Sequence, residues 1–227
     1  MSSTRTLVGG PPAASVRPRP HRRADLSVEH GLTYAGIITF AMAGALAGIQ
    51  KRFDIAGVVI LAVVTAVGGG SVRDIVAGVV PPTALTDEVQ LWLPVVTGVL
   101  VFATHHRLQT RRLLYVFDTL SLGLFAALGA QRGVDVGFGL LGTVFAGGVS
   151  GIGGGIIRDV LSGEIPGVMY RAGDLYATAA AAGAAVTYLL QPTGTTPALI
   201  VGAGVTVGLR AGSRLAGLNL PVPRTPE

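Results

Sequence analysis

Long apolar segments follow one another along most of the chain, separated by short loops that contain charged residues, proline or glycine. Seven such segments can be distinguished: Leu32–Gln50, Ile55–Val80, Leu91–Thr104, Leu113–Ala130, Gly137–Ser162, Asp174–Leu190 and Pro197–Ser213. A helix needs about 20 residues to cross the roughly 30 Å hydrocarbon layer of a bilayer. Leu91–Thr104 is the shortest segment and must borrow from its flanks. The pattern predicts an all-α, polytopic membrane protein with seven transmembrane helices.

The N-terminal segment, residues 1–30, differs in character from the rest of the chain. It is rich in proline and arginine and lacks the apolar stretch of a secretory signal peptide. We therefore expect a disordered basic tail at residues 1–30, a membrane domain at residues 31–220 and a short tail at residues 221–227.

Composition supports the membrane assignment. Half of the 227 residues are hydrophobic and 13% are charged, whereas a typical soluble domain has about 25% charged residues. The high hydrophobicity also argues against a disordered protein. Cysteine is absent and the four histidines form no ligand pattern, so we expect no metal site and no cofactor. With no nucleophile–base set in the sequence, we do not expect an enzyme.

The distribution of charge predicts an orientation. The net charge is +5, but the basic residues lie between apolar segments rather than along one polar face, so we expect no nucleic-acid partner. If the helices alternate in direction, one side of the membrane receives Lys51, Arg52, Arg107, Arg111, Arg112, Arg171, Arg214 and Arg224. The positive-inside rule assigns that side to the cytoplasm. The prediction is a multi-pass protein of the cell membrane, with its N-terminus outside and its C-terminus in the cytoplasm.

Some of these basic loop residues are also candidates for binding anionic lipid headgroups. The candidates are Lys51, Arg52, Arg107, Arg111 and Arg112. The alternative is that they only mark the cytoplasmic side of the membrane.

An internal repeat organises the membrane domain. Val67–Gly78 recurs as Ile152–Gly163, and Pro81 and Pro166 follow the two copies at the same distance, which defines an 85-residue spacing. A weaker similarity, at an 81-residue spacing, relates the segment at 47–51 to the segment at 128–132. Coincidence of three glycines, an Arg-Asp pair, a further glycine and a proline in one register is not expected by chance.

The repeat and the helix count together predict the topology. Repeat 1, at about residues 31–104, and repeat 2, at about residues 113–190, each contain three predicted helices, and the helix at residues 197–213 is additional. Since three crossings is an odd number, the second unit must enter the membrane from the opposite side. Inverted repeats of this kind occur in secondary transporters, whose sites lie near the membrane midplane at the repeat interface.

A glycine triplet stands in the second helix of each repeat: Gly68, Gly69 and Gly70, and Gly153, Gly154 and Gly155. Glycine in a helix interior costs about 1 kcal/mol relative to alanine, so we expect each triplet to kink or locally unwind its helix. Backbone groups freed at membrane depth must then face protein or a cavity. The alternative is that the glycines only allow close contact between helices. Glycines in every fourth position, at 44/48 and at 204/208/212, also predict tight packing, more often within one subunit.

An Arg-Asp pair follows each triplet: Arg73-Asp74 and Arg158-Asp159. A charged side chain inside the bilayer costs at least about 2.5 kcal/mol and needs a partner or water. Because adjacent residues do not face each other on a helix, we expect pairing across the repeats, of Arg73 with Asp159 and of Arg158 with Asp74. The alternative is that these side chains snorkel to the membrane surface.

Three further polar residues lie in or beside the apolar segments. Ser71 follows the first triplet and can add polar lining to a pore. Asp118 is either a buried acid or a helix N-cap. Arg210 lies late in the last helix, and we expect it to snorkel to the cytoplasmic surface.

The doubled Gly-Gly-Gly-x-x-Arg-Asp motif, at residues 68–74 and 153–159, resembles the TRIC (trimeric intracellular cation channel) family, and most closely its prokaryotic members, also labelled a "glycine transporter" domain. The segments at 40–47 and 51–54 are similar to the first repeat of that family. The resemblance implies a homotrimer with one pore per subunit, between the kinked second and fifth helices. It also implies permeant potassium and sodium ions. The acid common early in the first helix of the family is absent here.

Three functions remain open on this evidence. The leading hypothesis is a potassium-permeable channel for monovalent cations, in which Asp74 and Asp159 attract cations while Arg73 and Arg158 limit the negative field. The second is a secondary transporter of a small amino acid such as glycine, with helix N-termini holding the carboxylate. The third is a structural membrane protein with a closed, glycine-packed core.

Overall fold

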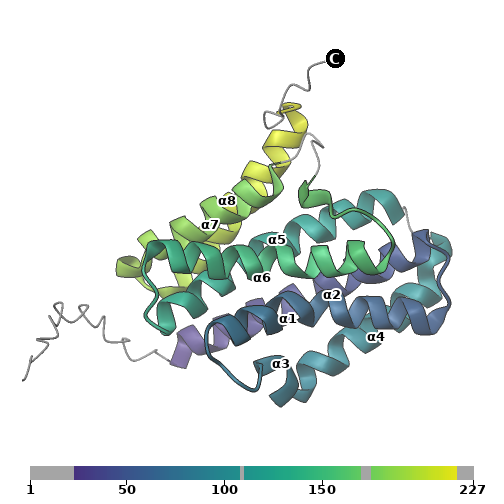
Figure 1. Ribbon diagram of the computed structural model, residues 1–227, viewed down its shortest axis with the longest axis horizontal. Coiled ribbons are helices and arrows are strands. Elements are labelled where there is room, and N and C mark those ends of the chain that lie inside the picture. Colours follow the sequence, from purple (N-terminus) through teal and green to yellow (C-terminus); the bar gives the residue numbers. More distant parts are fainter. Residues whose placement is uncertain (1–22, 108–109, 170–174, 219–227) are drawn as a thin grey trace, which may run out of the picture.

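The computed structural model describes residues 23–107, 110–169 and 175–218, and every regular element within these ranges is a helix (Figure 1). Eight α-helices are present there: α1 (Arg23–Gln50), α2 (Ile55–Val76), α3 (Thr83–Thr86), α4 (Glu88–Thr104), α5 (Thr110–Asp135), α6 (Leu140–Leu161), α7 (Tyr176–Leu189) and α8 (Thr195–Leu215). Short 3-10 turns connect some of them: η1 (His105–Arg107), η2 (Gly167–Met169) and η3 (Gln191–Thr193).

Each of the seven predicted apolar segments overlaps one α-helix, and among the α-helices of the described residues only the short α3 has no predicted counterpart. The predicted boundary between the N-terminal tail and the membrane domain, at residues 30 and 31, lies too late in the sequence. Helix α1 begins at Arg23, so residues 23–30 of the predicted tail are helical, while residues 1–22 lie outside the described residues. By length and hydropathy, α1, α2, α5, α6 and α8 can each cross a membrane, and α4 is apolar but shorter.

Local signals explain where these helices begin and end. Asp54 caps α2, accepting a hydrogen bond of 2.7 Å from the Gly57 N–H through Oδ1. At the other end of α2, Gly78 has a φ of +74°, and Gly163 ends α6 in the same way with a φ of +71°. Glycine adopts this left-handed conformation at low cost and is therefore common just after a helix.

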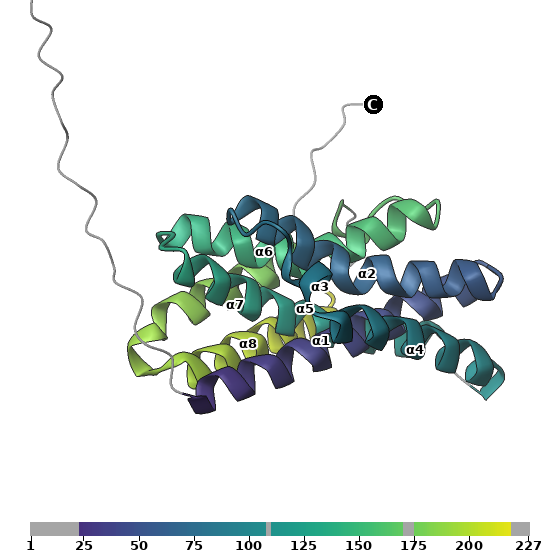
Figure 2. The same ribbon diagram turned by 90° about the horizontal axis from the view of Figure 1, so that it is seen from below.

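The helices form one bundle around α1, α2, α5 and α6, which pack against one another. Helix α4 covers α1 and α2 (Figure 1). Helix α7 packs against α5 and α6, and α8 packs against α5 and α7. Viewed from below, α2 and α6 lie along one side of the bundle, and α1, α4 and α8 lie toward the other (Figure 2). In the centre, the rings of Phe40 and Phe125, which correspond to each other in the repeat, have their centroids separated by 5.0 Å.

The contacts of the two halves match at the 85-residue spacing. A Cβ atom added to Gly44 of α1 would lie 2.6 Å from the Leu61 carbonyl oxygen of α2, and one added to Gly129 of α5 would lie 2.7 Å from the Ala146 carbonyl oxygen of α6. The alignment of the segments at 47–51 and 128–132, at the 81-residue spacing, is therefore wrong for the structure. Gly129 occupies the place of Gly44, and not that of Gly48.

Candidate functional site

Helices α2 and α6 cross at the glycine triplets without losing helical structure. Both helices run unbroken through Gly68–Gly70 and Gly153–Gly155, so the expected local unwinding is not found. Instead, a Cβ atom on Gly69 would lie 2.5 Å from the Ser150 carbonyl oxygen and 2.8 Å from the Gly154 nitrogen. The glycines thus let two backbones touch, and this packing compensates their low helix propensity.

The two Arg-Asp pairs do not pair across the repeats as expected. The Arg73 guanidinium donates to Oδ1 of its neighbour Asp74 from Nε at 2.9 Å and from Nη2 at 2.7 Å. Arg158 contacts Oδ1 of Asp159 in the same way, from Nε at 2.9 Å and from Nη2 at 2.8 Å. The predicted pairs Arg73–Asp159 and Arg158–Asp74 are therefore wrong. Although adjacent side chains leave a helix in different directions, the long arginine chain can fold back to the neighbouring carboxylate.

Each of these aspartates also accepts a backbone N–H from the start of the next short helix, α3 or η2. Asp74 Oδ2 accepts from the Thr83 N–H at 2.9 Å and from the Thr83 hydroxyl at 2.6 Å. Asp159 Oδ2 accepts from the Gly167 N–H at 2.9 Å. The pairs thereby anchor the returning loops to the ends of α2 and α6.

Polar contacts between the two halves use partners other than the predicted ones. Arg73 Nη1 lies 3.4 Å from the Ser150 hydroxyl of α6. Arg132 Nε of α5 lies 3.6 Å from Asp74 Oδ1. Lys51, at the end of α1, forms an ion pair with Glu164, which follows α6.

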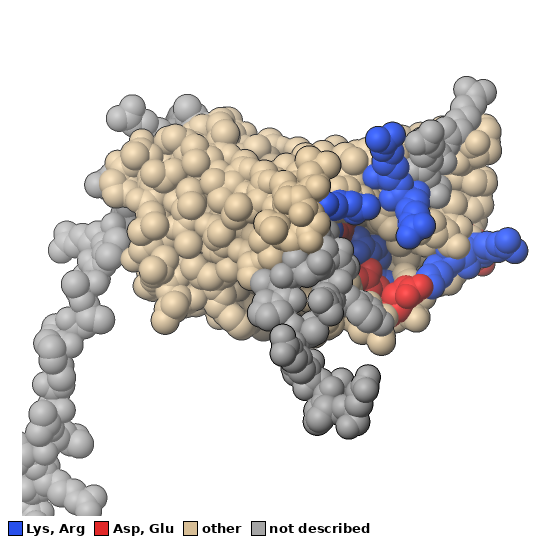
Figure 3. All heavy atoms as spheres, turned by 90° about the horizontal axis from the view of Figure 1, so that it is seen from above, with Lys and Arg blue, Asp and Glu red and all other residues tan. Residues whose placement is uncertain are grey.

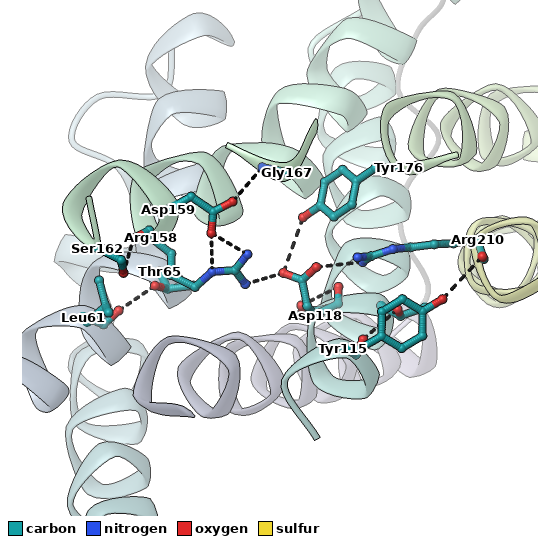
Figure 4. A network of polar contacts seen from close by, with 12 residues as sticks. Leu61, Thr65, Tyr115, Asp118, Arg158, Asp159, Ser162, Gly167, Tyr176 and Arg210 are labelled. Atoms are coloured by element: carbon teal, nitrogen blue, oxygen red, sulfur yellow. Dashed lines mark hydrogen bonds and ion pairs between the residues drawn. The ribbon is translucent and has the colours of Figure 1, made fainter. Parts of the chain in front are cut away.

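Asp118 lies well inside α5 and is 4% exposed, so it is a buried acid rather than a cap. Two arginines from different helices bind its carboxylate (Figure 4). Arg158 Nη1 donates to Oδ1 at 2.5 Å, and Arg210 Nη1 of α8 lies 2.8 Å from Oδ2. The Tyr176 hydroxyl of α7 lies 3.5 Å from Oδ1. Four helices thus meet at one carboxylate.

Arg210 is 4% exposed, so the expectation that it snorkels to the surface is wrong. Its guanidinium lies over the ring of Tyr176, 4.2 Å from the centroid, and 5.1 Å from the centroid of Tyr115. Cation–π contacts and the Asp118 carboxylate together replace the water that a charged group loses on burial. A position late in an apolar helix does not reveal such partners, because they come from α5 and α7.

Two cavities lie beside the crossing of α2 and α6. The Asp118 cavity, of about 120 Å³, is lined among others by Asp118, Gly155, Arg158, Tyr176 and Arg210. The Arg73 cavity, of about 110 Å³, is lined by residues of α1 to α5 that include Thr33, Gly70, Arg73, Phe125 and Arg132. On the face drawn in Figure 3, acidic and basic side chains gather around a hollow near one end, and the rest of the described surface in view carries no charged side chain.

The remaining predicted residues lie outside these cavities. Ser71 is half-buried and lines neither of them. Lys51, Arg52, Arg111 and Arg112 are exposed, and the side chain of Arg107 lies outside the described residues. Lipid binding by these basic residues stays a prediction. Among the described residues, no group of histidines and carboxylates has the arrangement of a metal site.

Asp87, in the loop before α4, contacts Gln90, which lines the Arg73 cavity. Burial acts to raise the pKa of the Asp87 carboxyl, but hydrogen bonds from Gln90, from the Tyr34 hydroxyl and from the Val89 N–H outweigh this effect, and the charge of His30 adds to them. The pKa of Asp87 is therefore held below its ordinary value.

Sequence reasoning missed Tyr176, Arg132 and Thr83 and misplaced Arg210. The signal for Arg210 was present in the repeat. At the 85-residue spacing, the counterpart of Asp118 is Thr33, so the first half has no acid at the equivalent position. Helix α8 lies outside the repeat and carries Arg210 within its apolar span. Two charges without a counterpart are candidates to pair with each other.

Comparisons with known proteins agree on one family. A family model described as "Glycine transporter" matches the chain twice, over residues 30–106 and 115–192. The UPF0126 membrane protein of Deinococcus radiodurans is 50% identical over 200 residues, which cover 87% of this chain and 93% of that protein. The UPF0126 inner membrane protein YadS of Escherichia coli K12 is 35% identical over 195 residues, which cover 84% of this chain and 93% of that protein.

Solved structures of TRIC channels have the same fold. The TRIC trimeric intracellular cation channel orthologue from Rhodobacter sphaeroides gives a TM-score of 0.79 at 35% identity, covering 85% of this chain and 100% of that chain. A prokaryotic TRIC channel in 0.5 M KCl gives a TM-score of 0.80 at 34% identity, covering 86% of this chain and 100% of that chain. The chain is therefore a multi-pass membrane protein and belongs to the family that the glycine transporter model describes and whose solved structures are TRIC cation channels.

Proposed function

We propose that this protein is a channel for monovalent cations, with potassium and sodium as the permeant ions. The observation that carries the proposal is the likeness to solved TRIC cation channels along the full length of those chains. Three carboxylates support it, because acidic groups inside an apolar bundle mark ion pathways. Asp74 at the end of α2 and Asp118 in α5 are buried, and Asp159 at the end of α6 is partly buried.

The proposed path in each subunit passes between α2 and α6 at the two glycine triplets and joins the Asp118 cavity to the Arg73 cavity. Gly155 lines the first cavity and Gly70 lines the second. Asp74 and Asp159 attract cations, Arg73 and Arg158 limit the negative field, and Ser71 adds polar lining. In this proposal, the close approach of the two backbones at Gly69 blocks the path in the conformation described. Conduction therefore requires α2 and α6 to separate there.

The proposed topology has seven crossings, with α1, α2 and α4 as one unit, α5, α6 and α7 as an inverted second unit, and α8 as the seventh helix. The matched contacts at the 85-residue spacing support the duplication. The positive-inside rule places the N-terminus outside and the C-terminus in the cytoplasm. We extend the trimeric assembly named for the Rhodobacter channel to this chain and propose a homotrimer in contact with membrane lipids.

Planar-bilayer recording of the purified protein tests the channel against the carrier. The expected result is discrete unitary currents in potassium solutions, with reversal potentials that follow the cation gradient. Protein-free bilayers are the baseline. Saturable uptake of glycine coupled to an ion, without unitary currents, would establish the secondary transporter and overturn the channel. A labelling experiment with cysteines introduced at residues 52 and 194 tests the orientation, because the proposal places the first inside and the second outside.

A further inference from the structure

The Asp118 cavity contains one acid and one base in addition to the Arg-Asp pair that occurs in both halves of the chain. In both halves the arginine that follows the triplet binds its own neighbouring aspartate, and that aspartate accepts a backbone N–H from the next short helix. Asp118 and Arg210 are the acid and the base of this cavity that do not belong to that shared arrangement. Thr33 stands in the place of Asp118 in the first half, and α8 has no counterpart there.

The two residues neutralise each other at the cavity. The carboxylates of Asp118 and Asp159 balance the guanidinium groups of Arg158 and Arg210, so the group has no net charge. Each Asp118 oxygen has its own arginine: Oδ1 faces Arg158 and Oδ2 faces Arg210. While Arg210 is in place, both oxygens of this carboxylate already contact a guanidinium, and a cation that enters the cavity meets no net negative charge.

Arg158 and Arg210 differ in how they are held. Arg158 also binds Asp159, the next residue along the same helix, and so has a carboxylate partner without Asp118. Arg210 reaches Asp118 from α8 and rests against the rings of Tyr176 and Tyr115. Its guanidinium is thus a cation attached to a separate helix, and it can leave the carboxylate without disturbing the Arg158–Asp159 pair.

The cavity has room for an ion in place of that group. Its volume of about 120 Å³ is several times the roughly 10–15 Å³ that one water requires on the same measure. We propose that Asp118 is a binding site for monovalent cations that Arg210 occupies in the closed protein, so that α8 inhibits conduction by supplying an internal competitor. This inference rests on the proposed channel function.

Substitution of Arg210 tests the competition directly. Arg210→Gln leaves a net negative charge at the cavity, and a charge of one sign in a cleft concentrates counter-ions by about tenfold or more. We therefore expect the unitary potassium conductance at low salt to rise by about tenfold, with half-saturation at a lower potassium concentration. The matched control is Arg214→Gln, which removes the same charge one turn later on α8, where the guanidinium lies over Tyr115 rather than at Asp118. We expect this control to conduct as the wild type does.

A second pair of variants tests the effect of the Arg210 charge when the Asp118 carboxylate is absent. In Asp118→Asn, only Asp159 balances Arg158 and Arg210, so the cavity carries a net positive charge. We expect this charge to reduce cation conductance. Adding Arg210→Gln to Asp118→Asn should restore conductance toward the wild-type level, because neutrality returns. This comparison also applies if Arg210→Gln alone fails to elute as a folded oligomer.

The outcomes separate the two proposals. A wild-type protein without cation currents would refute the channel itself. If the wild type conducts and Arg210→Gln conducts within a factor of two of it, or if Arg214→Gln produces the same rise, the competition is refuted. A fall in melting temperature for Arg210→Gln without a rise in low-salt conductance would make the Asp118–Arg210 pair purely structural. If Arg210→Gln does not fold, failure of the double variant to exceed Asp118→Asn overturns the proposal.

Discussion

Replacement of Gly69 by alanine puts the crossing of α2 and α6 to a quantitative test. The new methyl group would lie 2.5 Å from the Ser150 carbonyl oxygen and 2.8 Å from the Gly154 nitrogen, whereas ordinary contacts begin near 3.4 Å. The two backbones must therefore move apart by about 0.9 Å, and overpacking of this kind costs about 1–3 kcal/mol. The higher helix propensity of alanine stabilises the helix by at most about 1 kcal/mol relative to glycine. We expect a net loss of about 1–2 kcal/mol, seen as a lower melting temperature in detergent.

Gly148 of α6 provides the matched control, because no atom beyond its chain neighbours and its own helix backbone lies within 4 Å of the position where its Cβ would be. The same glycine-to-alanine change there adds helix propensity without a clash and should leave the melting temperature unchanged or raise it. If Gly69→Ala melts at or above the temperature of Gly148→Ala, the close backbone contact is not what the triplets provide. Intrinsic helix propensity would then be the dominant effect at both positions.

Substitutions at three positions test the polar contacts. Asp118→Asn removes the shared charge from two buried arginines and should cost about 3–5 kcal/mol, measured as a fall in melting temperature. Thr83→Val removes the 2.6 Å hydrogen bond to Asp74 and should cost about 1–3 kcal/mol; Thr83→Ser, which keeps the hydroxyl, should be close to the wild type. For Asp87, the lowered folded pKa means that its stabilising effect is complete above the unfolded value of about 3.9 and is lost as pH falls through the folded pKa. Melting temperatures recorded from pH 7 down to pH 3 should therefore decline less in Asp87→Asn than in the wild type.

The helical segments followed from the sequence because membrane crossing imposes a length and a composition that short-range patterns carry. The boundaries were less certain, since polar residues can extend a helix beyond the apolar layer. Helix α1 begins at Arg23 for this reason. The duplicated glycine motif was also visible, because its residues are contiguous and occur twice in one register.

The ion pairs could not be derived in the same way. Spacing rules describe where a side chain leaves the helix, but an arginine can direct its guanidinium to several places along its length. Arg73 and Arg158 consequently bind their own neighbours, against the rule for adjacent residues. Arg210 required knowledge of tertiary neighbours, because Asp118 and Tyr176 belong to two other helices.

The glycine triplets illustrate a different difficulty. Low helix propensity correctly marked Gly69 and Gly154 as unusual positions, but propensity does not distinguish a broken helix from a helix with a close neighbour. The structure has the close neighbour. Only the position of the opposite backbone decides between the two, and that position is set by the whole bundle.

The 85-residue correspondence provides each experiment with an internal reference. Thr65 and Ser150, or Gly44 and Gly129, occupy equivalent places in the two halves, and the same change can be made at either place within one molecule. A substitution and its twin should have similar effects wherever the halves are equivalent. A difference between the two effects then reports the influence of α8 and Asp118, which have no counterpart in the first half. Comparing twin variants along the chain would thus locate the functional asymmetry of the protein without reference to any other protein.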